Sequence, residues 1–462
     1  MRGRGRRSYV PGHGDAERKG RSMSEPTHDG GGERTRERDE RDRQEGTRPA
    51  GAGRGAEPRE GQGALRPGGR QHAGQQGAGT AAGQGAGRGG GGRGAEEAAA
   101  VRAATGTLVY GFALSRITGA FVRLGIPDAL AGTALPADRL AHATGTDEPS
   151  LRRLLRAATA LGLLTVRPGR RYELTLLGEL FRDDPRLRRL AELYGDPAVW
   201  QAYGALEDAV RDGGSAFHHA HGTGLFAALE TDGPLAARFN KAMGTVTAAV
   251  TEPVLAGFDF GGIRHLVDVG GGDGTLLAAL LRAYPHLRGT LLERPAALAA
   301  APGVLRAAGV ADRCTLVEGD FFAAVTAGDG GGPADACLLK NILHNFGDDD
   351  CVRVLRACRA ALRPGGRVLV PALVLPEAAG GSRTQADAEV AMALSDVEMM
   401  VLTAGRERTL AEYRGLFARA GLALPPELPP ALPGLAHHHM LEGTSGTPHE
   451  TEEARDAAAV RR

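Results

Sequence analysis

The spacing of apolar residues changes twice along the chain, and each change predicts a different kind of structure. Large apolar residues are almost absent before residue 99. From Val101 they recur every three or four positions, which predicts amphipathic helices as far as about residue 257. Beyond His265 short apolar runs alternate with helical stretches, so strands and helices are expected in turn.

The first helical part has the element order of a winged helix. One helix is expected to end near Gly125, and a short helix, a turn at 144–146 and a second helix at 148–161 follow it. A two-strand hairpin is expected around Pro168. We therefore expect a mostly helical winged-helix domain over residues 99–190.

The last part has the alternation that builds a parallel sheet with helices on both faces. It predicts a doubly wound, Rossmann-like α/β domain over 258–436, joined to the first domain by a helical linker over 191–257 that contributes to a binding pocket. Ligands of such domains lie at the carboxyl ends of the strands. The expected strands are 265–269, 290–292, 314–317, 336–339 and 367–370, and the expected helices are 275–283, 297–308 and 349–362.

Composition separates both ends of the chain from these domains. Residues 1–98 are rich in glycine and arginine, and they contain too few large apolar side chains to offset the entropy of ordering the backbone. We expect them to be a disordered tail. Residues 437–462 are expected to be a second one, after a proline-rich stretch.

Charge and cysteine content narrow the possible partners. A net charge of +1 argues against nucleic acid or an acidic membrane as a partner. Four cysteines without a CxxC pair argue against zinc and against a disulfide framework, and no apolar run is long enough to span a membrane. We expect a cytoplasmic protein. The histidine groups at 218–221 and 437–439 lack supporting carboxylates or cysteines, so we interpret both as loops and expect no metal.

The winged helix leaves one function of another class open. Arg152, Arg153 and Arg156 share roughly one face of the second helix, and a DNA-binding regulator could place that face in the major groove. Most of the chain lies outside this motif and carries a different signal. A solvated helix face is therefore the favoured interpretation.

A glycine loop is expected where the first strand of the sheet meets its helix. Gly270, Gly272 and Gly274 form a GxGxG pattern, which allows a tight turn and a close approach of the backbone to a ligand. A related pattern binds the pyrophosphate of dinucleotides. Here Asp268 and Asp273 would repel a pyrophosphate but suit an amino group and a sulfonium, which favours S-adenosylmethionine.

Three residues near the ends of the next strands fit the rest of that cofactor. Glu293 ends the second strand, where it can accept hydrogen bonds from both ribose hydroxyls. Asp320 and Phe321 follow the third strand and offer an acceptor for the adenine amino group and an aromatic face.

These segments resemble S-adenosylmethionine-dependent O-methyltransferases, the family of plant caffeate and flavonoid enzymes and of bacterial polyketide O-methyltransferases. The resemblance is carried by LVDVGGGDGTLLAALLRAYP, LLERP, VEGDFF and LLKNILHNFGDDDCVRVLRACRAALRPGGRVLV, and it extends over about 108–424. It implies that the N-terminal domain serves dimerisation and that the protein is a homodimer. It also implies a small aromatic substrate that carries a hydroxyl.

The resemblance assigns the catalytic residues as well. His344 matches the family's general base, and Lys340 matches a position that contacts the cofactor. Glu407 matches one of two glutamates that orient the histidine, but Ala372 stands where the other should be and Asn345 where many members have aspartate. With one carboxylate missing, His344 should be a weaker base.

The missing carboxylate leaves two outcomes open. Methylation of an aromatic natural product, polyketide-like or phenolic, survives if proximity and alignment supply most of the acceleration. Alternatively, the chain resembles bacterial members that bind the same cofactor without methylating and that hydroxylate or decarboxylate anthracycline-like substrates. Glu398 is either a replacement carboxylate facing the pocket or a solvent-exposed helix residue, and Met392, Met399 and Met400 share its helix.

Overall fold

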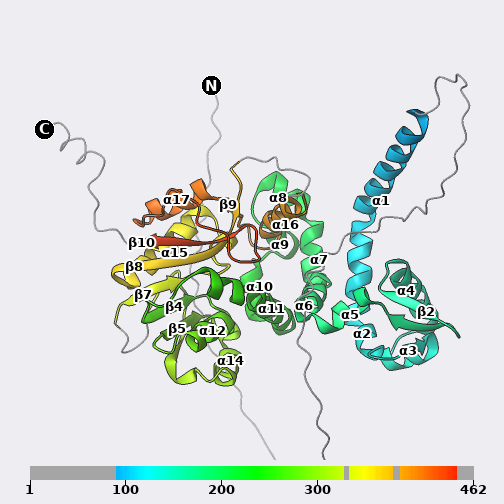
Figure 1. Ribbon diagram of the computed structural model, residues 1–462, viewed down its shortest axis with the longest axis horizontal. Coiled ribbons are helices and arrows are strands. Elements are labelled where there is room, and N and C mark those ends of the chain that lie inside the picture. The colour runs from blue at the N-terminus through cyan, green and yellow to red at the C-terminus, as the bar shows by residue number, and fades with distance from the viewer. Residues whose placement is uncertain (1–89, 327–331, 378–385, 445–462) are drawn as a thin grey trace, which may run out of the picture. The chain divides into compact units, whose positions relative to one another are not determined.

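The computed structural model describes residues 90–326, 332–377 and 386–444 (Figure 1). The expected N-terminal tail lies outside the described residues up to residue 89. The first helix begins at Gly90, inside the stretch we assigned to that tail. Residues 95–100, AEEAAA, are strong helix formers and explain why the helix extends before residue 99, whereas the glycines among residues 90–94 have low helix propensity.

Helices and a small sheet build the N-terminal domain. The helix after the turn begins with Asp147, whose side chain accepts a hydrogen bond from the backbone N–H of Ser150. The hairpin strands pair with each other, and a third short strand adds to the hairpin edge. The elements are α1 (Gly90–Arg123), α2 (Ile126–Ala129), β1 (Leu135–Pro136), α3 (Ala137–Thr144), α4 (Glu148–Ala160), β2 (Leu164–Arg167) and β3 (Arg171–Leu174).

Seven helices connect this domain to the sheet. Three of them begin with an aspartate cap, Asp184, Asp196 or Asp232, with proline within the first two helical positions. His218, His219 and His221 lie in one of these helices, so their interpretation as a loop is wrong. The helices are α5 (Leu176–Asp183), α6 (Pro185–Tyr194), α7 (Pro197–Gly204), α8 (Leu206–Asp212), α9 (Ala216–His221), α10 (Leu225–Thr231) and α11 (Gly233–Gly257).

The C-terminal domain contains the expected doubly wound sheet. Its strand order is β10-β8-β7-β4-β5-β6, with β9 paired to β8, and all pairs are parallel except β10 with β8. The chain runs from β4 to β5 and β6 on one side and later adds β7 on the other, so the switch point lies between β4 and β7. The strands are β4 (His265–Val269), β5 (Arg288–Glu293), β6 (Cys314–Glu318), β7 (Ala334–Leu338), β8 (Leu362–Leu375), β9 (Arg408–Thr409) and β10 (His438–Thr444).

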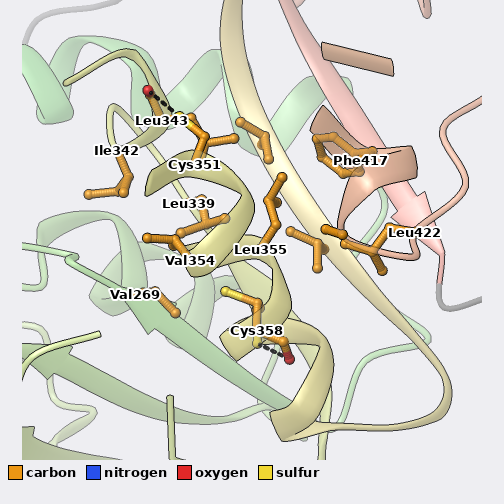
Figure 2. Close-up of a cluster of buried hydrophobic side chains, with 14 of the residues drawn as sticks. Val269, Leu339, Ile342, Leu343, Cys351, Val354, Leu355, Cys358, Phe417 and Leu422 are labelled. Carbon is orange, nitrogen blue, oxygen red and sulfur yellow. Dashed lines mark hydrogen bonds between the residues drawn. The ribbon is translucent and has the colours of Figure 1, made fainter. Parts of the chain in front are cut away.

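Successive residues of each strand point to opposite faces of the sheet, where they pack into two separate hydrophobic cores. Val267 and Val269 pack with α15 and α17 on one face, where Cys351, Val354 and Leu355 point at the sheet (Figure 2). The other face packs against α12 and α14. The helices of this domain are α12 (Thr275–Ala283), α13 (Pro295–Leu298), α14 (Ala301–Ala307), α15 (Asp348–Ala361), α16 (Ala386–Leu402) and α17 (Leu410–Arg419), with the 3₁₀ turns η1 (Ala311–Arg313) and η2 (Leu343–Asn345).

The C-terminal boundary differs from the expectation. Residues 438–444 form β10, which pairs with β8 from Arg367 to Leu373, so the predicted disordered tail over 437–462 and the loop at the second histidine group are wrong there. Met440 and Leu441 are buried against the two cores, and this burial holds the strand in place. Residues 445–462 lie outside the described residues. Among the helices that the structure describes, none is long and apolar enough to cross a bilayer.

Candidate functional site

The glycine loop turns sharply at the end of β4, next to the segment that follows β7. Gly270 has φ of +68°, and its N–H donates to the carbonyl of Leu292 at 2.8 Å. A Cβ at this position would lie 2.5 Å from Cδ1 of Ile342 and 3.3 Å from Cε1 of Phe321. Only glycine therefore allows the loop to lie against these two side chains.

Glu293 is bound to the glycine loop by its carboxylate. One oxygen accepts from the N–H of Gly272 at 2.9 Å, and the other accepts from the N–H of Arg294 at 2.7 Å. Burial raises the pKa of Glu293, although the two backbone hydrogen bonds oppose this rise. The structure thus brings together the predicted residues Gly270, Gly272 and Glu293.

Asp268 and Lys340 place opposite charges beneath the loop. Asp268 is buried, and its Oδ2 has no hydrogen-bond partner in the described residues. Burial and the charge of Glu293 raise the pKa of Asp268 to about 7, while Lys340 opposes them. Burial lowers the pKa of Lys340 to about 8, against the charges of Asp268 and Asp273. The Nζ of Lys340 donates to Oγ1 of Thr247, on α11, at 2.7 Å.

Asp320 and Phe321 lie at the turn after β6. Oδ1 of Asp320 accepts from the N–H of Phe322 at 2.9 Å, and the residue is exposed. The Phe321 ring lies 5.0 Å from the Phe322 ring and 6.0 Å from the Phe346 ring. Phe321 therefore reaches the glycine loop as part of an aromatic cluster, whereas the Asp320 carboxylate forms the turn with one of its oxygens.

The residues around the loop fit S-adenosylmethionine. The unpartnered, buried oxygen of Asp268 and the glycine backbone that no Cβ could replace are what a close-fitting cationic ligand requires. Glu293 and Asp273 add acidic groups. The positive charge of Lys340 opposes the rise in the pKa of Asp268. This donor set suits a sulfonium and an amino group better than it suits a pyrophosphate.

His344 and Glu407 form a hydrogen-bonded pair. Nδ1 of His344 lies 3.1 Å from Oε1 of Glu407, which also accepts from Oγ of Ser395 at 2.8 Å. Burial would raise the pKa of Glu407, but the hydrogen bonds and the charge of His344 hold that pKa below its usual value. Nε2 of His344 makes no hydrogen bond to a described residue, and the side chain is 17 % exposed. A proton acceptor is therefore available on the side away from Glu407.

An arginine that the sequence reasoning missed holds the turn that carries His344. Arg408 is fully buried, and it donates to the carbonyls of Leu343 at 3.1 Å and Phe346 at 2.8 Å and to Asp348 at 2.8 Å. It thus binds both ends of η2. Its position directly after Glu407, in the short strand β9, is the only signal that pointed to it.

The backbone of the same turn touches a second loop. Gly405 lies so close to η2 that a Cβ there would overlap the carbonyl oxygen of His344. Asn341 has φ of +56°, and Nδ2 of Asn345 donates to its carbonyl at 2.8 Å. Asn345, which stands where the family often has aspartate, therefore stabilises the local backbone.

The second carboxylate that the family places beside the histidine is absent, as the sequence predicted. A different carboxylate, that of Glu398, lies on α16. Ala372 is buried in β8 and brings no acidic group. Glu398 is largely buried on α16, and its Oε1 accepts from the hydroxyl of Tyr194 at 2.5 Å. The alternative of a solvent-exposed Glu398 is therefore wrong. The sequence offered no signal for Tyr194, because it lies 204 residues earlier in the chain.

The described residues contain neither a metal-ligand cluster nor a disulfide. They contain no group of three or more histidine, cysteine or acidic residues arranged to hold a metal ion. Their four cysteines, Cys314, Cys337, Cys351 and Cys358, are free thiols. Arg152, one of the residues behind the regulator hypothesis, is paired with Glu148 on its own helix.

Comparison with protein families matches both domains. The O-methyltransferase domain family matches residues 203–423, and the O-methyltransferase dimerisation domain family matches residues 107–184. The latter match covers the helices and hairpin that raised the regulator hypothesis.

Comparison with individual proteins finds relatives that span most of the described chain. The mitomycin biosynthesis 6-O-methyltransferase of Streptomyces lavendulae is 34% identical, over 72% of this chain and 92% of that protein. The 3-amino-4-hydroxybenzoate 4-O-methyltransferase of Streptomyces cremeus is 37% identical, over 65% of this chain and 79% of that protein. The aclacinomycin 10-hydroxylase RdmB of Streptomyces purpurascens is 36% identical, over 62% and 75%.

Solved structures with bound ligands resemble the fold. The O-methyltransferase NcsB1 from neocarzinostatin biosynthesis was solved in complex with S-adenosyl-L-homocysteine and 1,4-dihydroxy-2-naphthoic acid. It is 30% identical with a TM-score of 0.61, covering 72% of this chain and 96% of that chain.

Proposed function

The chain belongs to the O-methyltransferase family and uses S-adenosylmethionine, and from this premise we propose that it methylates a hydroxyl of an aromatic natural product with His344 as general base. The observation that supports this most is the hydrogen bond between Nδ1 of His344 and Glu407, because it leaves Nε2 able to accept a proton. One relative is named a mitomycin biosynthesis 6-O-methyltransferase and another a 3-amino-4-hydroxybenzoate 4-O-methyltransferase, and the second name supports an aromatic acceptor.

The pair of His344 and Glu407 supplies the base and its orientation. A phenol has a pKa of about 10 and is mostly protonated at neutral pH, so removing its proton makes it a better nucleophile. Nε2 of His344 takes that proton, and the carboxylate of Glu407 stabilises the imidazolium that results. Ser395 and the N–H of Glu407, which donates to Asp396 at 2.8 Å, hold the carboxylate in place.

The cofactor supplies an electrophilic methyl group on a cationic sulfur. Gly270 and Gly272 provide the close backbone surface, and Glu293 is positioned by the N–H of Gly272 to receive the ribose hydroxyls. Phe321 lies against the loop for the adenine ring, and the second oxygen of Asp320 is the acceptor for its amino group. Lys340 offsets the buried charge of Asp268 beside them.

We also propose that the protein works as a homodimer. The dimerisation match covers 107–184, and α1 exposes large apolar side chains that a monomer would leave in water. These side chains are Leu108 (82 % exposed), Val109 (64 %), Tyr110 (64 %) and Phe112 (62 %).

A His344→Ala variant tests the base. We expect methyl transfer from labelled cofactor to 3-amino-4-hydroxybenzoate to fall by about 10²- to 10⁴-fold. Cofactor affinity, measured by calorimetry, should stay within about twofold, because the glycine loop and Glu293 are untouched. Loss of both together would identify a structural histidine, and unchanged turnover would assign the base elsewhere.

One relative favours a second candidate function. RdmB is a hydroxylase, and Ala372 leaves this site with a single carboxylate on His344. In that case the chain would bind S-adenosylmethionine and modify an aromatic polyketide without transferring label. Label in the product therefore separates the two functions.

A further inference from the structure

Helix α16 holds Glu407 at two points through consecutive residues. Oδ1 of Asp396 accepts from the backbone N–H of Glu407 at 2.8 Å. Oγ of Ser395 donates to Oε1 of the Glu407 side chain at 2.8 Å. The following residue, Arg408, is fully buried and is bound to η2. The backbone of Glu407 is therefore fixed on both sides, and only the torsions of its side chain remain to be set.

Ser395 uses its hydroxyl outside its own helix. A hydroxyl inside a helix commonly donates to the carbonyl one turn earlier. Thr159 in α4 and Thr251 in α11 do this, with O···O distances of 2.8 Å and 2.9 Å. Ser395 lies in the middle of α16 but donates to a residue 12 positions later in the chain. Serine favours a helix less than alanine does, so local helix stability does not account for this residue.

The two donors that the described residues offer to the Glu407 carboxylate use the same oxygen. Nδ1 of His344 lies 3.1 Å from Oε1, and Ser395 donates to that atom as well. The last torsion of a glutamate side chain has a broad range, so one contact from His344 does not fix which oxygen faces the ring. The hydroxyl of Ser395 restricts that torsion. Burial raises the pKa of Glu407, but His344 and the hydrogen bond from Ser395 bring that pKa below its usual value, so the oxygen that faces the ring is anionic.

We propose that Ser395 is a positioning residue that holds Oε1 of Glu407 against Nδ1 of His344 and thereby keeps the ring proton on Nδ1. A neutral imidazole carries one proton, and the hydrogen bond made by one nitrogen decides which nitrogen bears it. With the proton on Nδ1, Nε2 keeps the lone pair that accepts a proton from the substrate. The inference rests on the proposed function, because only a base at His344 gives this tautomer a catalytic consequence.

Nitrogen-15 NMR of histidine-labelled protein tests the proposal without turnover, at a pH above neutrality. The chemical shifts of the two ring nitrogens report which one carries the proton, and His344→Ala identifies the signals of His344. The Nδ1–H form should dominate in the wild type. In Ser395→Ala the ratio of Nδ1–H to Nε2–H should fall about tenfold, the change expected from loss of one hydrogen bond. Alanine is a stronger helix former than serine, so α16 is retained in this variant.

Kinetics of labelled methyl transfer provide the second readout. In Ser395→Ala, kcat should fall in proportion to the population of the Nδ1–H form, while the affinity for S-adenosylhomocysteine and the KM of the acceptor should stay within about twofold. Ser395→Thr returns a hydroxyl and should restore both the tautomer and kcat. Thr159→Val is the matched control, because it removes a hydroxyl that donates within α4, and it should change neither readout.

The NMR readout separates this inference from the proposed function. A tautomer that depends on Ser395, in a protein that transfers no label, would support the inference and count against methyl transfer alone. Label transfer with an unchanged tautomer in Ser395→Ala would overturn the inference and leave the proposed function standing. A Ser395→Thr variant that behaves like Ser395→Ala would overturn the inference as well.

Discussion

Asp268 is the residue at which burial and charge conflict most directly. Its pKa is raised to about 7 and that of Lys340 is lowered to about 8, so both groups change charge near neutral pH. A cation bound beside them favours the deprotonated form of each. Binding of S-adenosylmethionine should therefore release protons between pH 6 and 8.

This release has a measurable consequence. The affinity for S-adenosylmethionine should increase with pH over that range, by at most about tenfold per pH unit for each proton released. Calorimetry in two buffers with different ionisation enthalpies measures the release, which should be smaller for uncharged-sulfur S-adenosylhomocysteine and smaller again in Asp268→Asn. A heat of binding that is independent of the buffer would contradict the electrostatic assignment.

Arg408 carries a prediction about stability. Removing its side chain as Arg408→Met leaves the carbonyls of Leu343 and Phe346 without their buried donor, which should lower the free energy of unfolding by about 1–3 kcal/mol for each, whereas Asp348 is partly exposed and keeps Arg406 as a partner. Arg353→Ala is the matched control, because its ion pair with Asp350 is exposed and should contribute less than about 1 kcal/mol. Denaturant titration measures both, and equal small losses would show that Arg408 does not hold η2.

The sequence predicted the functional residues of the site better than it predicted the residues that hydrogen-bond to them. His344 and Glu407 were expected together and lie 3.1 Å apart, while their catalytic roles remain predictions. Thr247 and Tyr194 were missed because each reaches the site from an element far away in the chain, and Ser395, 12 residues before Glu407, was missed because it approaches from a different helix. Such partners depend on packing between helices, and no local spacing encodes them.

At the scale of elements, the contact between the 403–408 loop and η2 is the tightest in the site. A methyl group at Gly405 must push the backbone of His344 away, so Gly405→Ala should reduce turnover by about 10²-fold through misplacement of the proposed base. Gly415→Ala is the control, because Gly415 lies in α17 with open space around it, and the change should stabilise the helix by about 0.5–1 kcal/mol.

The comparison of Gly405→Ala with Gly415→Ala requires thermal unfolding curves as well as kcat and cofactor affinity. If Gly405→Ala unfolds the protein, the cooperative melting transition is lost. If the variant folds, cofactor affinity should be retained while kcat falls. Full activity in a folded Gly405→Ala would show that η2 tolerates displacement.

Strand and helix positions were predictable where apolar runs are short and bounded. The expected 265–269 strand and 275–283 helix have the bounds of β4 and α12. In contrast, β8 extends to Leu375 and β10 was taken for a tail, because proline-rich residues precede it and histidines occupy its start. Pairing with β8 and burial of Met440 and Leu441 outweigh that weak local preference.

At the scale of the whole molecule, the apolar surface of α1 predicts assembly. Leu108→Glu combined with Phe112→Glu would place two charges in the proposed dimer interface, so the dimer should dissociate to monomers in light scattering. Val210→Glu, at a residue of α8 that is 68 % exposed, is the control and should remain dimeric. A wild-type protein that is monomeric at micromolar concentration would contradict the homodimer.

The antiparallel strand β10 also has a consequence for biosynthesis. A nascent chain that has emerged only as far as α17 can assemble β4 to β8, yet the edge of β8 from Arg367 to Leu373 still lacks its neighbour. Until residues 438–444 leave the ribosome, that edge exposes unpaired amide and carbonyl groups to other chains. Chaperones should therefore matter most for this protein in the interval between the emergence of α17 and the emergence of β10.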